Sequence, residues 1–415
     1  MFTNRDLRNL IVPLFVEQFL LMLVGLADTF VVSFVGDAAV SGVSLVNAFN
    51  TVFLFLFTAL ASGGAVIISQ YIGSGNNERA GRSAGQLLML SVLSAVALSA
   101  AILLFQRPLL EALFGKVEEP VMEACGIYLR ISAYSFPALA VYNAGAALCR
   151  SIGKTNVTMY ISTAANGINI VGNLVGVFAL GAGVAGVAYP SLIARTLSAA
   201  AVTVYCFAQR LPVRYRRREI FTWDGELLKR VLGIAIPNGV ENGVHQLVKV
   251  ALSSMVALFG TYQIAANGVA QSIWSLAALM GQAMAPVFTT VIGQCMGAGD
   301  REAANFYFKK LSRITFVLSV AWNALVFALT PILMGFFAIS DEAKSLVIWL
   351  VLINNVVNGI AYPFAGPLGS GLRAAGDVRF TMITSIVLTV AARLVFSAAF
   401  AVWLNWGVLG IAAGM

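Results

Sequence analysis

An aspartate lies deep inside the apolar stretch of residues 10 to 35, which is long enough to cross a bilayer. This residue, Asp28, lies roughly 27 Å along a helix that starts at Leu10, at ~1.5 Å per residue. An ionisable side chain in hydrocarbon is costly, so carboxylates found there usually face a cavity and bind an ion, a proton or a substrate. Asp28 is therefore the first candidate for chemistry in this chain.

Two asparagines, Asn169 and Asn173, are four residues apart and therefore share one face of an expected helix at 157 to 179. They are candidates to complete a pocket around Asp28, because carboxylate and amide oxygens suit a hard cation. H+ and Na+ both remain open as ions for this pocket, and the sequence indicates no other metal and no cofactor. The alternative is that the two amides hold neighbouring helices together, as asparagines do in membranes.

A second group of ionisable residues, Glu241, His245 and Lys249, follows an i, i+4, i+8 pattern that places them on one side of a helix. Three such groups on one stripe predict a wet cavity, to which the neighbouring Gln246 would also contribute. His245, the only histidine, can carry a proton near neutral pH or serve only as a hydrogen-bonding side chain of the cavity, whereas Lys249 would disfavour a cationic substrate beside it. Further polar and aromatic residues expected to line this cavity are Asn47, Tyr142, Gln271, Trp274, Gln282, Asn354, Asn355 and Asn358.

Two prolines inside the expected helices, Pro13 and Pro237, are hinge candidates, because each removes a backbone hydrogen bond and lets a helix bend. Each is followed four residues later by a glutamate, Glu17 or Glu241. This symmetry predicts a shared structural role for the two glutamates near a cytoplasmic gate.

The composition places these residues in a polytopic all-α membrane protein. Only 11% of the residues are charged, 59% are hydrophobic, and the mean hydropathy is +0.87, which excludes a soluble domain of this length. The expected spans lie near residues 10–35, 43–72, 83–105, 126–149, 157–179, 184–208, 231–259, 264–296, 311–338, 343–371 and 380–404.

The basic residues indicate the orientation of the chain in the membrane. If the amino terminus is cytoplasmic, 19 of the 26 Lys and Arg residues fall in cytoplasmic loops or helix ends, which is the positive-inside pattern. We therefore expect an integral protein of the plasma membrane, the inner membrane of a bacterium, with a cytoplasmic amino terminus. The basic run at residues 214–218 is interpreted as a topogenic loop that can also touch anionic lipids, and no nucleic-acid partner is expected.

The second half of the chain repeats the first. The segment QYIGSGNNERA at residues 70–80 returns as QCMGAGDREAA at residues 294–304, a shift of 224. The landmarks that keep nearly this shift are Pro13 and Glu17 with Pro237 and Glu241, Pro108 with Pro331, Arg150 and Gly153 with Arg373 and Gly376, and Gly183 and Gly186 with Gly407 and Gly410.

Such a duplication predicts two parallel six-helix repeats around a central cavity. The expected division is an N-terminal lobe at residues 1–208, a basic cytoplasmic linker at 209–230 and a C-terminal lobe at 231–415. Because the chain stops five residues past Gly410, we expect the twelfth span of this design to be truncated after its start.

Several features together resemble a prokaryotic multidrug and toxic compound extrusion (MATE) transporter. These are the two six-helix halves, LADTF around Asp28, the SQYIGSGN and GQCMGAGD turns, the R-x-x-G-[KD] segments that begin at Arg150 and Arg373, and N-x-x-x-N at Asn169. The resemblance implies export of amphiphilic, often cationic, small molecules in exchange for protons or sodium by a monomer among membrane lipids. It also implies that Asp28 is the coupling carboxylate.

The family pattern also marks what this chain lacks. In part of the family the position of Asn173 is an acid, so sodium coordination by two carboxylates is not expected here. The main alternative is a flippase of lipids or lipid-linked oligosaccharides in the same superfamily. An intramembrane enzyme is disfavoured because the sequence shows no nucleophile motif, metal cluster or phosphate loop, and a passive channel is disfavoured by the hinge prolines and the repeat.

Overall fold

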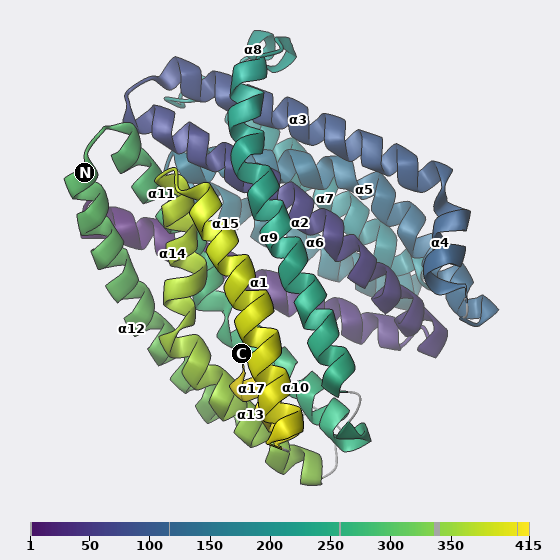
Figure 1. Ribbon diagram of the computed structural model, residues 1–415. Coiled ribbons are helices and arrows are strands. Elements are labelled where there is room, and N and C mark those ends of the chain that lie inside the picture. Colours follow the sequence, from purple (N-terminus) through teal and green to yellow (C-terminus); the bar gives the residue numbers. More distant parts are fainter. Residues whose placement is uncertain (1, 116, 257–258, 336–340, 405, 415) are drawn as a thin grey trace. The chain divides into compact units, whose positions relative to one another are not determined.

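The structure of the protein is a computed structural model that describes residues 2–115, 117–256, 259–335, 341–404 and 406–414. Every regular element within these ranges is a helix, which confirms the all-α fold (Figure 1). The chain divides into two compact units, residues 2–236 and the part from Pro237 onward.

The first unit is built around a long central helix, α5, which packs against α2, α3 and α7, while α6 packs against α1 and α7. Buried aromatic and aliphatic side chains such as Phe57, Leu129 and Phe136 fill its core. Its helices are α1 (Asn4–Ser33), α2 (Asp37–Gly73), α3 (Asn77–Leu104), α4 (Gln106–Phe114), α5 (Glu119–Ser151), α6 (Thr155–Leu174), the π-helical turn η1 (Val175–Ala179), α7 (Ala185–Cys206), α8 (Arg217–Phe221) and the start of α9 (Gly225–Val256).

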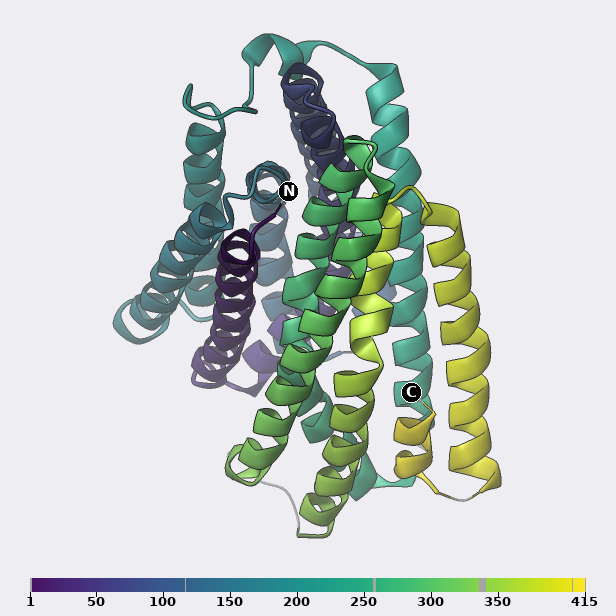
Figure 2. The ribbon, with the colours of Figure 1, turned by 90° about the vertical axis from the view of Figure 1, so that its left-hand side faces the viewer.

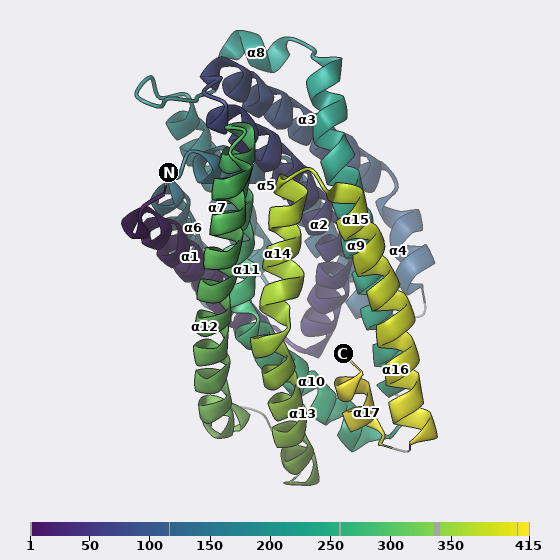
Figure 3. The same ribbon diagram turned by 60° about the vertical axis from the view of Figure 1, so that its left-hand side comes forward.

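The second unit contains the rest of α9 and the helices that follow it. Figures 2 and 3 show α12 running beside α13 and α14, and these helices pack together. The helices are α10 (Thr261–Ala277), α11 (Leu279–Gly297), α12 (Arg301–Met334), α13 (Asp341–Ile360), α14 (Tyr362–Ala374), α15 (Val378–Val387), η3 (Leu388–Leu394), α16 (Val395–Ala398), η4 (Ala399–Trp403) and α17 (Val408–Ala413).

Two of the expected spans, 264–296 and 343–371, are found as single candidate membrane spans, Gln263–Gly297 and Glu342–Ala374, but each is interrupted at one residue. The stretch at 264–296 is divided between α10 and α11 at Ala278, and the stretch at 343–371 between α13 and α14 at Ala361. Pro363 lies at the start of α14, where its missing N–H does no harm because the first turn leaves that donor unpaired. The residues expected to start a twelfth span form the short helix α17, and Met415 lies outside the described residues.

Ten helical stretches within the described residues are long and apolar enough to cross a membrane. Helix α9 is not among them although it has 32 residues, since it carries Glu241, His245 and Lys249 in addition to its charged first turns. The chain is therefore an integral membrane protein in which α9 is the most polar of the long helices.

The duplication is visible in the turns as well as in the sequence. The two glycine-containing turns that follow α2 and α11 place Gly75 and Gly299 at the same φ of +74°, a left-handed backbone that favours glycine. The next residue caps the following helix in both cases. Asn76 accepts from the backbone of Arg79 at 3.0 Å, and Asp300 accepts from that of Ala303 at 2.8 Å. The repeated motif is thus a helix-to-helix turn with an N-cap.

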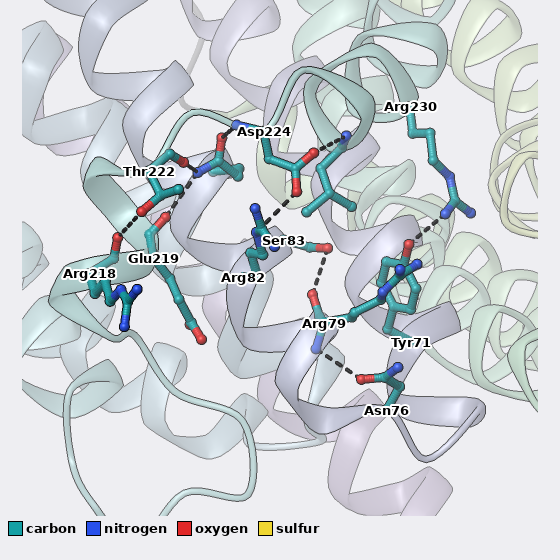
Figure 4. Close-up of polar contacts among 12 residues, drawn as sticks. Tyr71, Asn76, Arg79, Arg82, Ser83, Arg218, Glu219, Thr222, Asp224 and Arg230 are labelled. Carbon is teal, nitrogen blue, oxygen red and sulfur yellow. Dashed lines mark hydrogen bonds and ion pairs between the residues drawn. The ribbon is translucent and has the colours of Figure 1, made fainter.

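The segment between α7 and α9 packs against the N-terminal part of α3 (Figure 4). The fully buried side chain of Gln86 donates to the backbone carbonyls of Glu219 at 2.9 Å and Thr222 at 2.5 Å, and accepts from the backbone N–H of Asp224 at 3.0 Å. Two further contacts hold its end, an ion pair of Arg82 with Asp224 at 3.0 Å and a hydrogen bond from Arg230 to Tyr71 at 2.6 Å. The expected linker of residues 209–230 is therefore anchored to the first unit.

Replacing Gln86 by leucine should expose this segment to protease. The change removes the side chain that bonds two backbone carbonyls and one N–H of this segment, and each lost hydrogen bond costs roughly 0.5–1.5 kcal/mol. Since cleavage of a transiently opened segment follows the population of its open form, trypsin should cut after the arginines at 214–218 at least ~10 times faster. Limited digestion followed by mass spectrometry measures this rate. Glu78→Gln, an exposed change on the same helix, is the control, and equal rates for the two variants would contradict the anchoring role.

Candidate functional site

Asp28 on α1 is joined to two asparagines of α6. Asn173 donates from Nδ2 to Oδ1 of Asp28 and also to Oδ1 of Asn169, the latter at 3.2 Å. The two asparagines are buried, with 1% and 6% of their surface exposed, whereas Asp28 is half-buried. The structure therefore brings together the three residues that the sequence predicted as one pocket.

Close packing of α6 against α7 holds the asparagines in place. A Cβ on Gly172 would lie 2.6 Å from Pro190, and one on Gly176 would lie 2.2 Å from the backbone oxygen of Gly186, so only glycine fits at these positions. Asn169 uses this proximity to donate to Ser191 on α7 at 2.8 Å. The position of Asn173 beside Asp28 therefore depends on three helices, not on α6 alone.

Sequence reasoning missed one charged member of this pocket, Arg195 on α7. Its guanidinium donates to Ser135 Oγ at 2.7 Å, and its positive charge acts on both Asp28 and Tyr128. Tyr128 in turn donates to Asn47 Oδ1 at 3.1 Å. Arg195 is the only charged residue in the span of α7, a signal of the same kind as the lone acid at Asp28. We call Asp28, Asn169, Asn173, Ser191 and Arg195 the first polar cluster.

The first polar cluster can bind and release one positive charge. Asn173 Oδ1 is buried and lacks a hydrogen-bond partner among the described residues, so one oxygen beside Asp28 is available to a proton-bearing group or a cation. Within the same ranges no three His, Cys, Asp or Glu side chains gather in a group able to hold a metal ion. The cluster thus offers one carboxylate and amide oxygens, a set that fits a monovalent ion better than a transition metal.

Glu17, the second acid of α1, lies in a closed network. Arg150 donates to it at 2.8 Å, Tyr142 at 3.1 Å and Thr158 at 3.1 Å, and its side chain is 1% exposed. Tyr142, expected to line a substrate cavity, therefore contacts this network.

The second unit contains the matching ion pair. Arg373 donates to Glu241 at 2.9 Å, and both residues are the repeat partners of Arg150 and Glu17. This arrangement agrees with the shared structural role expected for the two glutamates. It also means that the carboxylate of Glu241, proposed from sequence as a cavity residue, is already held by a basic side chain.

The other ionisable residues of α9 lie farther along the same stripe. His245 Nε2 lies 2.9 Å from Ser385 Oγ and 3.3 Å from Thr389 Oγ1, which joins α9 to α15 and η3. Lys249 is exposed and Gln246 is half-buried. Their role in substrate binding remains a prediction.

The expected cavity asparagines of α13 lie together inside the second unit. Asn354, Asn355 and Asn358 are 4–5% exposed. Asn355 donates to the backbone oxygen of Asn323 at 3.3 Å and Asn358 to its side-chain oxygen at 3.0 Å. Asn323 on α12, which sequence reasoning did not single out, is the centre of this network.

The remaining predicted positions are dispersed. Trp274 packs edge-on against Tyr362, Gln271 is half-buried and Gln282 is exposed. Both hinge candidates, Pro13 and Pro237, lie inside helices that continue through them, so their bending remains a prediction.

Comparison with known proteins agrees with the two-lobed arrangement. The family model MatE matches the chain twice, at residues 13–175 and 237–398. The chain is similar to YisQ, an uncharacterized transporter of Bacillus subtilis, with 26% identity over 96% of this chain and 88% of that protein. It is also similar to a probable multidrug resistance protein NorM of Thermotoga maritima, with 23% identity over 99% of this chain and 89% of that protein.

Among solved structures, the chain is similar to a MOP superfamily transporter from Pyrococcus furiosus whose binding pocket is described as having reverse polarity. The TM-score is 0.91 with 22% identity, and the match covers 99% of this chain and 91% of that one. This likeness shows a shared fold. The family model matches twice and covers most of the chain, which establishes that this chain belongs to the MatE family, a family of membrane transporters and not of enzymes.

Proposed function

We propose that this protein is a secondary active antiporter that exports amphiphilic or cationic compounds in exchange for protons by alternating access, with Asp28 as the coupling carboxylate. The observation that carries this proposal is the contrast between the two acids of α1. Glu17 is held by Arg150 in a closed network, whereas Asp28 has an amide as its hydrogen-bond partner. The charge of Asp28 is therefore available for neutralisation.

In the proposed cycle Asp28 binds either a proton or the exported compound, but not both at once. In the outward-facing state a proton from outside neutralises the carboxylate, the compound loses its anionic anchor, and it leaves the protein. After the protein opens inward, the proton departs and the charge returns. A ligand shifts such an equilibrium only by its different affinity for the two states, and a membrane potential adds ~2.3 kcal/mol per elementary charge per 100 mV.

The surroundings of Asp28 favour a proton over sodium. The group that Asn173 directs at the carboxylate is its N–H donor, and the positive charge of Arg195 acts on the same carboxylate. Both features oppose a second cation bound beside Asp28. They also stabilise the ionised carboxylate, whereas the partial burial of the side chain favours its neutral, protonated form. The side-chain oxygen of Asn173, Oδ1, has no hydrogen-bond partner among the described residues, and turning it toward a sodium ion would break both hydrogen bonds that the amide donates.

Relatives and charge distribution support the efflux direction and the location. The Thermotoga maritima relative is named a probable multidrug resistance protein, and we extend small-molecule export to this chain. The excess of Lys and Arg in the expected cytoplasmic loops supports a plasma-membrane protein with a cytoplasmic amino terminus, in which the anchored segment of residues 209–230 faces the cytoplasm. We keep the monomer as the working assembly.

Gradient-driven efflux from proteoliposomes tests the proposal. Vesicles that contain the full-length protein are loaded with the cationic dye rhodamine 6G, and the membrane potential is clamped with potassium and valinomycin. An inward proton gradient should drive dye release, whereas an inward sodium gradient of equal size should give no more than ~10% of that rate, which corresponds to a preference of about 1.4 kcal/mol. Efflux driven by sodium alone would refute the proton assignment, and scrambling of a fluorescent glycolipid without dye efflux would favour the flippase alternative.

A further inference from the structure

Three basic side chains lie together where α9 meets η3 in the second unit. His245 is fixed by Ser385 and Thr389. Lys249 follows His245 by one helical turn, and Arg393 follows Thr389 by about one turn, so both basic side chains come next along the same contact. Helices α9 and α15 run side by side in the same direction (Figures 1 and 3), so this register keeps the three side chains on one side of the contact, in agreement with the electrostatic influence of Arg393 on His245 and Lys249. We call His245, Lys249 and Arg393 the cationic cluster.

No acid in the described part of the second unit neutralises the cationic cluster. Glu241 is the acid whose charge acts on His245, but its carboxylate is already paired with Arg373 at 2.9 Å. The Nε atom of Arg393 is buried and has no hydrogen-bond partner within the described ranges. Unpaired charges inside a membrane are costly and mark sites that bind a partner, so this cluster needs an anion to complete it.

The repeat gives an independent indication, because the equivalent helices of the two units carry opposite charge. A shift of 224 places Lys249 opposite Gly25 and Arg393 opposite Asn169. In the first unit these helices hold the carboxylate of Asp28 beside Asn169 and Asn173. Duplication alone therefore does not account for the two cations, which belong to the second unit only.

The backbone around Arg393 departs from the repeat as well. The π-helical turn η4 at residues 399–403 matches η1 at residues 175–179 under the same shift, whereas η3 at residues 388–394 falls opposite an ordinary stretch of α6. Short π-helical segments occur frequently at functional sites because they change the direction in which side chains project. The extra segment is the one that contains both Thr389 and Arg393.

We propose that the second unit binds an anionic group of the transported compound, a carboxylate or a phosphate, between Lys249 and Arg393. The guanidinium matches the geometry of such groups with two parallel N–H donors, and the ammonium adds a compact charge. This inference rests on the proposed transport function and narrows its substrates from amphiphilic cations to amphiphiles that also carry an acid group. A compound with a positive charge alone gains nothing from this site.

Equilibrium binding of a matched pair of dyes tests the inference without any ion gradient. Rhodamine B carries a free carboxylate, and its methyl ester replaces that charge by a neutral ester one methyl group larger. Fluorescence polarisation with the full-length protein in lipid nanodiscs should show that the acid binds about 10 times more tightly or better, as expected for a charge-assisted pair worth ~1.5–3 kcal/mol. Equal affinity of the wild-type protein for the acid and the ester would overturn the proposal.

Matched variants locate the effect. Arg393→Gln and Lys249→Gln should each reduce the preference for the acid toward 1 while ester binding stays the same, which also shows that the variants are folded. Arg393→Lys keeps the charge and should retain most of the preference. Arg379→Gln, an exposed change on α15, should behave as wild type. A preference that survives both glutamine variants would place the anion elsewhere and refute this site.

Two further measurements separate the remaining outcomes. Displacement of the acid dye by phosphatidylglycerol but not by phosphatidylcholine would assign the site to a lipid headgroup and overturn its assignment to the transported compound. The Asp28→Asn variant should keep the full preference for the acid because the cationic cluster and the coupling acid belong to different units. For the wild-type protein, absence of proton-driven efflux with an intact preference for the acid would count against the proposed function alone. Proton-driven efflux of the ester by a wild-type protein that shows no preference for the acid would count against this inference alone.

Discussion

Replacing Asp28 by asparagine is expected to reduce proton-driven efflux to the level of protein-free vesicles. The amide has the same shape and keeps a hydrogen-bonding group beside Asn173, but it cannot take up or release a proton in the working pH range. In this variant neither the outward nor the inward state binds a proton at residue 28. The proton therefore has no different affinity for the two states and cannot shift the equilibrium between them. The measurement is dye efflux under an inward proton gradient with the potential clamped.

Two variants distinguish lost coupling from lost structure. Glu111→Gln makes the same acid-to-amide change at an exposed position on α4 and should leave efflux unchanged. Asp28→Glu keeps the charge and should restore part of the activity. Binding of rhodamine 6G to Asp28→Asn should weaken by less than about tenfold, or ~1.4 kcal/mol. Full proton-driven efflux by Asp28→Asn would remove the coupling role of this residue.

Replacing Arg150 by methionine should cause the largest loss of stability. The change keeps the bulk of the side chain but leaves Glu17, which is 1% exposed, as a buried charge without its basic partner, and breaking such a pair costs roughly 3–5 kcal/mol. For a unit of this size the unfolding temperature should fall by on the order of 10 °C. The four buried free cysteines, Cys125, Cys149, Cys206 and Cys295, allow a thiol-reactive dye to report unfolding directly.

The repeat supplies the control for this experiment. Arg373→Met breaks the equivalent pair in the second unit, where Glu241 is 14% exposed and Arg373 12%, so water relieves part of the charge and the loss should be smaller. Adding Glu17→Gln to Arg150→Met should recover most of the lost stability, because the buried charge is then gone. A double variant no more stable than Arg150→Met would show that the pair is not what stabilises this part of the unit.

Features that follow from local patterns were predictable from the sequence. The apolar spans, the duplication and the glycine turns depend on residues close together in the chain, and the structure contains helices and turns at these positions. The contact of Asn173 with Asp28 was also predicted, because an acid in one span and an i, i+4 pair in another are both rare in hydrocarbon and need partners.

Other contacts depend on packing that no local pattern encodes. A lone arginine such as Arg195 indicates a buried cation but not which acid it faces. Gln86 appears as an ordinary polar residue near a helix end, and only the return of the chain between α7 and α9 gives it three backbone partners. The break at Ala361 also escaped prediction, since Pro363 is compatible with either a kinked helix or a new start.

The contact between Gly176 and Gly186 has a consequence for how the first unit can move. Gly176 lies in η1, which continues α6, and Gly186 lies in α7. The two backbones touch without side chains between them, so sliding η1 and α6 along α7 would drive main-chain atoms into each other. We therefore expect α6 and α7 to move together as a rigid body. Glu17 ties the first half of α1 to Arg150 and Thr158. Beyond Glu17, α1 meets α6 through the contact of Asp28 with Asn173, and we expect this part of α1 to shift when the carboxylate changes its charge.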